Sequence, residues 1–158
     1  MESESITRYY EADHDRLDGL FRNFQASKRS NFQKAKDSFR EFKIGLQRHI
    51  LWEEHILFPL FEEKTLMKGT GPTEVMRREH IQIKDLLEAI HHKVQAQDSE
   101  SDQEEEALLE VLGAHNQKEE HILYPAIDRL LSPDERKHVF HRMEGVTGEE
   151  LGTCCSGH

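Results

Sequence analysis

Two stretches of this chain are near copies of each other, and they constrain the fold more than any other feature. Residues 49–59 read His-Ile-Leu-Trp-Glu-Glu-His-Ile-Leu-Phe-Pro, and residues 115–125 read His-Asn-Gln-Lys-Glu-Glu-His-Ile-Leu-Tyr-Pro. Each begins with His-x-x-x-Glu, which puts two side chains able to bind a metal one helical turn apart. The copies are offset by 66 positions (115 minus 49), and the same offset relates His14 to His80. A repeated unit of this length suits a pair of helices, so the repeat predicts four helices.

The spacing of apolar residues also predicts helices. Apolar side chains recur every three, four or seven positions in four segments, and no segment alternates as a strand would. The expected helices cover about residues 3–26, 30–63, 73–97 and 101–131, and a short fifth helix covers about 132–143. The sequence therefore predicts an all-α fold, an antiparallel up-down four-helix bundle with a short C-terminal helix.

Length and composition favour one domain that binds a cation. With 158 residues, the chain can hold a single core, which we expect over residues 1–144. Residues 145–158 are expected to form a flexible Gly/Cys tail, with Cys154 and Cys155 as reduced thiols. The net charge of −10 argues against binding to nucleic acid or to anionic membranes. The sequence lacks a membrane-length apolar run and a signal peptide, so we expect a cytoplasmic protein.

Polar residues interrupt the core-facing stripes of the four predicted helices. In the last helix the stripe consists of Leu108, Leu112, His115, Glu119, Ile122 and Ala126. The first glutamate of each doubled pair therefore faces the core, while Glu54 and Glu120 are rotated by about 100° onto a flank. Six polar residues are expected to face inward, namely His14, His49, Glu53, His80, His115 and Glu119.

These inward residues need a partner, because a buried carboxylate without one costs several kcal/mol. No Arg or Lys shares their stripes, so they must either take up protons or bind a cation. Imidazole and carboxylate groups suit iron, manganese or zinc, and six ligands are too many for one tetrahedral zinc. Two metals can share the six, with bridging carboxylates and open positions for a solvent-derived bridge and an exogenous ligand. Iron is favoured because this arrangement suits dioxygen and redox chemistry; the alternative is a purely structural set of hydrogen-bonded core residues.

These motifs resemble the hemerythrin-like, or HHE cation-binding, family, of the bacterial single-domain type. The resemblance covers about residues 10–131 and rests on Ala-Asp-His-Asp at 12–15, Glu-His at 79–80 and the two repeated stretches. It implies an antiparallel four-helix bundle with a non-haem di-iron centre, in which two iron ions share an oxo or hydroxo bridge. Residue by residue, it makes the four histidines iron ligands and the two carboxylates bridges, the same six residues as the stripes: His14, His49, His80, His115, Glu53 and Glu119.

The chain departs from the pattern of oxygen-carrying hemerythrins. Those proteins place the last acid five residues after its histidine, whereas we prefer Glu119, which follows His115 by four. Those proteins have a further histidine four residues after the one in the third helix, where this chain has Lys84. The change argues against simple reversible oxygen transport, and Lys84 is expected at the rim of the site. Tyr10, one turn before His14, is either a packed core residue or a group that reaches the metal. Glu54 and Glu120 either orient the ligand histidines or face solvent.

The resemblance leaves three functions open. The first is binding or sensing of O2 or NO at an open iron position, coupled to a separate protein partner. The second is an enzyme that turns over peroxide, O2 or NO at the same centre. The third is iron handling, either sensing iron or donating it for the repair of damaged metal centres.

Overall fold

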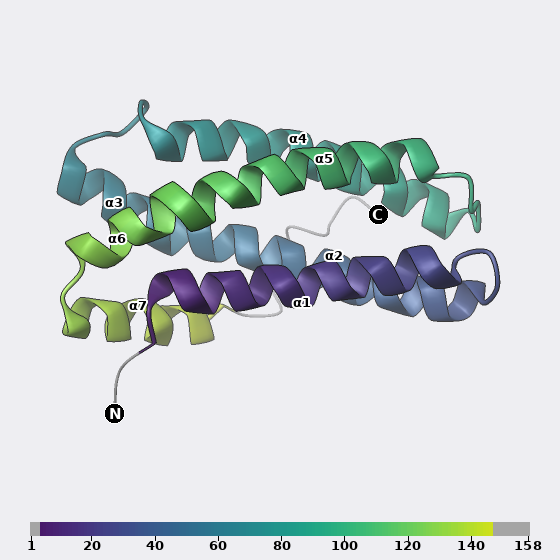
Figure 1. Ribbon diagram of the computed structural model, residues 1–158, viewed down its shortest axis with the longest axis horizontal. Helices are drawn as coiled ribbons and strands as arrows, with labels where there is room; N and C mark the ends of the chain where they lie inside the picture. The colour runs from purple at the N-terminus through teal and green to yellow at the C-terminus, as the bar shows by residue number, and fades with distance from the viewer. Residues whose placement is uncertain (1–3, 147–158) are drawn as a thin grey trace.

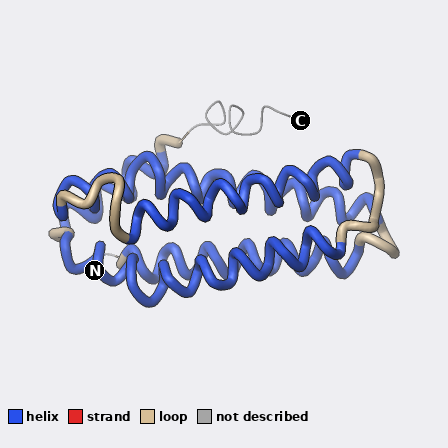
Figure 2. The backbone as a smooth tube through the Cα atoms, turned by 90° about the horizontal axis from the view of Figure 1, so that it is seen from above, coloured by secondary structure: helices blue, strands red, loops and turns tan. Residues whose placement is uncertain are grey.

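The computed structural model describes residues 4–146, and every regular element in that part of the chain is a helix (Figures 1 and 2). The predicted all-α class is therefore confirmed. Residues 1–3 and 147–158 lie outside the described residues, and with them most of the predicted tail, including Cys154, Cys155 and His158. The elements are α1 (Ile6–Ser27), α2 (Phe32–Trp52), η1 (Glu53–Leu57), α3 (Phe58–Thr65), α4 (Pro72–Gln95), α5 (Asp102–Lys118), η2 (Glu119–Leu123), α6 (Tyr124–Leu130) and α7 (Pro133–Glu144).

The helices form two pairs that lie side by side. Because α2, η1 and α3 follow one another without a break, as do α5, η2 and α6, the main body consists of four long helical runs. Short loops join α1 to α2 and α4 to α5, so the two members of each pair run antiparallel along each other (Figure 1). This arrangement is consistent with the predicted four-helix bundle. In Figure 2 the two pairs lie next to each other with their long axes roughly parallel.

The short C-terminal helix is close to its predicted bounds. Ser132 and Glu135 form a reciprocal capping box at the start of α7. The helix lies beside the first turns of α1 (Figure 1), where the Trp52 indole nitrogen donates a hydrogen bond to the Met143 carbonyl at 3.2 Å. The Tyr9 and Phe140 rings pack 5.1 Å apart at the same place. These contacts attach α7 to one end of the four helical runs.

The buried apolar residues form two clusters, separated along the helices by the inward-facing histidines and glutamates. We call the first the α7 cluster, because it gathers side chains around α3, α6 and α7, including Tyr10, Phe58 and Tyr124. The second, the distal cluster, fills the other end and includes Leu17 and Leu112. In three of the helical runs the polar residues come between these two clusters, and in the α2 run His49 and Glu53 lie on either side of the change from one cluster to the other. The polar layer is therefore closed at both ends by apolar packing.

Two π-helical turns, η1 and η2, distinguish the structure from the regular helices that the sequence predicted. Both have the sequence Glu-Glu-His-Ile-Leu, and the N–H of Phe58 and of Tyr124 bonds to the carbonyl five residues earlier. Such turns are rare and occur often at functional sites. Pro59 directly follows Phe58, and Pro125 directly follows Tyr124. Because proline has no N–H, the regular series of helical hydrogen bonds is already interrupted at these positions.

The π turn in the fourth helical run corrects one prediction. Regular α-helical spacing placed Ile122 on the inward stripe, but its side chain is 61% exposed. The turn accommodates one extra residue, so the stripe moves on by one position. Leu123 and Tyr124 are buried instead, and Ala126 is only partly buried. Among the described residues, no helix is both long and apolar enough to span a membrane.

Candidate metal centre

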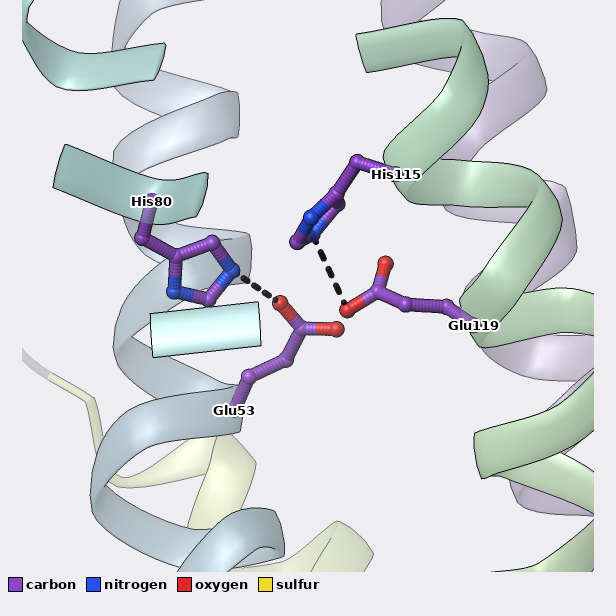
Figure 3. A group of neighbouring side chains, drawn as sticks. All are labelled: Glu53, His80, His115 and Glu119. Carbon is purple, nitrogen blue, oxygen red and sulfur yellow. Dashed lines mark ion pairs between the residues drawn. The ribbon is translucent and has the colours of Figure 1, made fainter. Parts of the chain in front are cut away.

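Four of the six predicted residues form one compact group between the two helix pairs. Glu53 begins η1, His80 lies in α4, and His115 and Glu119 lie on either side of the α5–η2 junction (Figure 3). His80 Nε2 lies 3.0 Å from Glu53 Oε1, and His115 Nε2 lies 3.2 Å from Glu119 Oε2. All four side chains are buried, and their donor atoms lie within 4.8 Å of one another, close enough to hold a metal ion.

The other two predicted residues complete a second group that shares a carboxylate with the first. His14 and His49 face each other with their Nε2 atoms 3.1 Å apart. Glu119 Oε1 lies 3.3 Å from His14 Nε2, and Glu53 Oε2 lies 3.5 Å from His49 Nε2. The structure therefore brings together all six residues predicted from the stripes.

Several atoms of the first group point at one another without forming hydrogen bonds. Glu53 Oε1, His80 Nε2 and Glu119 Oε2 are buried and have no hydrogen-bond partner among the described residues. A buried polar atom left unpaired costs about 1–3 kcal/mol, and more when it is charged. Nitrogen and oxygen atoms that converge without bonding each other are the arrangement that a cation between them would satisfy. The residues present therefore fit a metal, and the donor set suits iron, manganese or zinc.

In each Glu-Glu pair the two carboxylates have different roles. Glu54 accepts a hydrogen bond from His80 Nδ1 at 2.7 Å, and Glu120 accepts one from His14 Nδ1 at 2.7 Å. With Nδ1 bonded in this way, Nε2 faces the centre with its lone pair available for a metal. Of the two alternatives that the sequence left open, the structure supports the orienting role for both glutamates.

Two further carboxylates hold the remaining histidines, and the sequence predictions did not include them. Asp13 accepts a hydrogen bond from His49 Nδ1 at 2.8 Å, and Glu79 accepts one from His115 Nδ1 at 2.9 Å. Both acids directly precede a predicted ligand histidine and are themselves 66 positions apart (79 minus 13). That repeated acid-histidine pair was the available signal for this role.

Tyr124 is the other functional residue that the sequence predictions missed. Its hydroxyl donates to Glu53 Oε2 at 2.5 Å and lies 2.9 Å from Glu119 Oε1, so it contacts both central carboxylates. Burial and these two carboxylates raise the pKa of the Tyr124 hydroxyl well above its usual range. Tyr124 follows Glu119 by five residues, which places the two side chains together only across a π turn. The sequence signal for this residue was the Tyr-Pro end of the second repeated stretch. Regular α-helical spacing, however, predicts that the Tyr124 side chain points away from the centre.

Two residues predicted near the site lie at its edges. The Tyr10 hydroxyl donates to Met143 Sδ at 3.4 Å, and its ring packs 5.0 Å from the His49 ring, so it is a packed core residue. The Lys84 ammonium lies 3.6 Å from Glu54 Oε1, with 44% of its side chain exposed. Lys84 is therefore at the rim, as expected.

Without a cation, the negative charges of the central carboxylates raise the pKa values of the neighbouring histidines. Burial by itself lowers the pKa of His49, but the Glu53 carboxylate and the hydrogen bond to Asp13 outweigh it and raise the pKa to about 10. Burial also opposes protonation of His80, whose pKa is raised to about 9 by Glu53 and Glu54. Protons on the imidazoles therefore compensate the carboxylates, and a metal ion has to displace these protons in order to bind.

A small cavity adjoins the centre on the side of the distal cluster. Its volume is about 10 Å³. The six residues of the centre line it on one side, and apolar residues that include Leu17, Leu46, Ile83 and Leu112 line it on the other. This is roughly the space that one water-sized molecule occupies. Tyr124 belongs to the α7 cluster and so contacts the centre from the opposite side. One side of the centre thus faces a phenol, and the other faces a small space that apolar side chains close off.

Comparison with known proteins identifies the family. The model of the hemerythrin HHE cation-binding domain matches residues 5–127 of this chain. The chain therefore belongs to the hemerythrin HHE cation-binding family. Membership implies binding of a metal cation, and the cluster of buried histidines and glutamates is where this chain can hold one.

Individual relatives agree with this assignment. An uncharacterized hemerythrin-like protein of Schizosaccharomyces pombe is 27% identical over 145 residues, which cover 90% of this chain and 70% of the relative. Proteins named iron-sulfur cluster repair protein YtfE, from Salmonella paratyphi B and Salmonella newport, are 38% identical over 50 residues. That match covers 32% of this chain and only 23% of the relatives' own length. No solved structure matches the chain significantly.

Proposed function

We propose that this protein holds a non-haem di-iron centre that binds or senses a small ligand, O2 or NO, at an open iron position. Four histidines supply the nitrogen ligands in two pairs, His14 with His49 and His80 with His115. Glu53 and Glu119 bridge the two irons. Bound iron would supply the redox chemistry and the position to which the diatomic ligand attaches.

The observation that carries this proposal is how each central carboxylate divides its two oxygens. Glu53 directs Oε2 toward His49, at 3.5 Å, and Oε1 toward His80, at 3.0 Å. Glu119 directs Oε1 toward His14, at 3.3 Å, and Oε2 toward His115, at 3.2 Å. A carboxylate with one oxygen beside each histidine pair has the arrangement needed to bridge two ions. A single ion would be bound by only one histidine pair. It would not explain why each carboxylate also directs an oxygen toward the other pair.

The size of the adjoining cavity supports a ligand of very few atoms. A space of about 10 Å³, enclosed by the six residues of the centre and by apolar side chains such as Leu17 and Leu46, excludes larger substrates. The apolar part of the lining keeps bulk water away, which strengthens electrostatic interactions at the centre. Diatomic molecules fit this description better than sugars, nucleotides or peptides do.

A wide surface groove lies next to this cavity. A groove of about 560 Å³ lies between α1 and α5, and its walls include Asp18, Leu112, Gly113 and Asn116. Asp18, Leu112 and Asn116 also line the small cavity, so these three side chains separate the groove from it. The corresponding groove beside α2 and α4, which Lys84 lines, measures only about 100 Å³. The α1–α5 groove is therefore the favoured route for a ligand.

The proposal is tested with the purified chain and iron. The metal-free protein is titrated with ferrous iron under argon, its iron content is measured, and NO is then added while the absorption spectrum is followed. We expect two irons per chain and a saturable spectral change with NO. Less than one iron per chain, or no response to NO, would contradict the proposal. Steady-state consumption of peroxide or NO by the loaded protein would instead favour an enzyme.

Iron handling is a second candidate, because a partial relative is named an iron-sulfur cluster repair protein. That name describes the relative, which is much longer than the matched segment. An iron donor should lose its metal readily to an acceptor. The rate at which a chelator removes ferrous and ferric iron from the loaded protein distinguishes the two functions, since a sensor should retain iron during many cycles of ligand binding.

A further inference from the structure

The sequence repeat is broken at one position next to the centre. Phe58 and Tyr124 are related by the offset of 66 (124 minus 58), and each directly follows a π turn. The Phe58 ring packs on the His80 ring at 5.7 Å, and the Tyr124 ring packs on the His14 ring at 5.9 Å. The two aromatic residues therefore occupy equivalent places beside the two histidine pairs, both within the α7 cluster, and only Tyr124 carries a hydroxyl.

The Tyr124 hydroxyl oxygen lies close to four of the proposed ligand atoms. It is 2.5 Å from Glu53 Oε2, 2.9 Å from Glu119 Oε1, 3.2 Å from His49 Nε2 and 3.4 Å from His14 Nε2. These four atoms belong to the group around His14 and His49. Around His80 and His115, the equivalent ring is that of Phe58, which offers no such atom.

These distances are those found between neighbouring ligands of one ion. Bonds from nitrogen or oxygen to such metals are about 2.0–2.1 Å long, so two ligands at right angles lie about 3 Å apart. Among the four ligand atoms, His14 Nε2 lies 3.1 Å from His49 Nε2 and 3.3 Å from Glu119 Oε1, and His49 Nε2 lies 3.5 Å from Glu53 Oε2. The Tyr124 oxygen lies within 3.4 Å of all four, so its spacing from them is also that of a neighbouring ligand.

We propose that Tyr124 is a fifth ligand of the metal held by His14 and His49, which makes the two metal positions chemically unequal. This inference rests on the proposed di-iron function. The phenolic proton leaves to solvent when the oxygen binds. A phenolate is a hard, negatively charged donor, so the iron at this position is held more firmly in the ferric state than its neighbour. The small cavity adjoins the same ligands, since His14, His49, Glu53 and Glu119 all line it.

Tyr10 provides a matched control for this assignment. It is buried like Tyr124, and the two rings pack 5.0 Å apart. Its hydroxyl, however, donates to Met143 Sδ at 3.4 Å. If tyrosine near the centre affected the iron only through packing or burial, Tyr10→Phe and Tyr124→Phe would have similar effects.

The test is spectroscopic and needs no assay of activity. The full chain is loaded with iron, oxidised, analysed for iron content, and examined by visible absorption and by resonance Raman spectroscopy with ring-deuterated tyrosine. We expect a phenolate-to-ferric charge-transfer band and tyrosine ring modes that shift with deuteration. Both should be lost in Tyr124→Phe and kept in Tyr10→Phe. In the double variant Phe58→Tyr/Tyr124→Phe, which moves the phenol to the other metal position, the band should return.

The outcomes separate this inference from the function on which it rests. If the wild-type chain binds two irons but shows no phenolate modes, Tyr124 only donates a hydrogen bond, and the inference is wrong while the di-iron proposal stands. If Tyr124→Phe keeps the band, the ligand is another residue and the inference is again wrong. If the wild-type chain binds no iron, both proposals fail together.

Discussion

Glu120 accepts a hydrogen bond from His14 Nδ1 at 2.7 Å, although on its own helix it points to a flank and not toward the core. Glu54 has the same relationship to His80. The doubled glutamates thus provide one carboxylate to the centre and one to a histidine of another helix. Their two members should respond differently to substitution.

We predict that Glu119→Gln sharply lowers iron content, because it removes a negative charge and one donor oxygen from the proposed bridge. Glu120→Gln should have a mild effect, because the amide oxygen can still accept the bond from His14. Glu120→Leu removes that acceptor and should weaken metal binding by about 10–100-fold, as is usual for groups that orient metal ligands. Metal affinity measured by competition with a chelator checks this order. Equal loss in Glu119→Gln and Glu120→Gln would contradict it.

The metal-free protein should become less stable as the pH rises. The pKa values of His49 and His80 are raised from 6.5 to about 10 and about 9. A group that binds its proton more tightly when folded stabilises the fold fully below its unfolded pKa, and this contribution is lost as pH rises through the folded pKa. We expect the urea midpoint of chelator-treated protein to fall between about pH 6.5 and 10.

Iron should reverse this dependence, because imidazoles bind metal only without their protons. The loaded protein should melt at a higher temperature than the metal-free protein, and it should lose iron on acidification. Thermal melts and iron retention measured over the same pH series provide the comparison. Identical melts with and without chelator would mean that the histidines and glutamates do not bind iron as a group.

Access through the α1–α5 groove can be tested at a glycine. A Cβ added to Gly113 meets nothing within 4 Å, and Gly113 lines the groove, so Gly113→Phe places a ring at the groove wall and also replaces a poor helix former. We predict that this variant slows iron uptake and NO binding severalfold, measured by stopped-flow absorption, without loss of stability. Gly19 is also helical with nothing within 4 Å, which makes Gly19→Phe the control. Equal rates in both variants would exclude this route.

A buried ion pair at the end of the helices away from α7 is expected to affect the stability of the fold but not iron binding. Lys28 and Glu105 are 3% and 2% exposed, and the Lys28 ammonium bonds to the Glu105 carboxylate at 2.5 Å. Ser101 and Gln25 donate to the same carboxylate. Lys28→Met should leave Glu105 uncompensated and lower the free energy of unfolding by about 3–5 kcal/mol.

Arg29→Met is the matched control, since Arg29 forms an exposed pair with Asp102 near the same loop. Its effect on chemical denaturation should be much smaller than that of Lys28→Met. Iron content should be unchanged in both variants, because the pair lies beyond the distal cluster. A change in iron content in Lys28→Met would mean that this end of the molecule influences the centre.

The sequence by itself determined the helices and the six inward residues. Both follow from local regularities, namely apolar spacing along one helix and a repeat that presents His-x-x-x-Glu twice. Residues on one stripe of a helix face the same side in any helical packing, so His49 and Glu53 had to point inward together. The repeat then indicated that His115 and Glu119 form the matching pair.

Only the tertiary structure decided which groups meet across helices. The pairing of Asp13 with His49, and of Glu120 with His14, depends on how separate helices pack, and spacing along one helix carries no information about that. The position of Tyr124 depended on the π turn. Spacing arguments assume 3.6 residues per turn, and a single shift from i+4 to i+5 bonding rotates every later side chain. That rotation exposes Ile122 and brings the Tyr124 hydroxyl to the two central carboxylates.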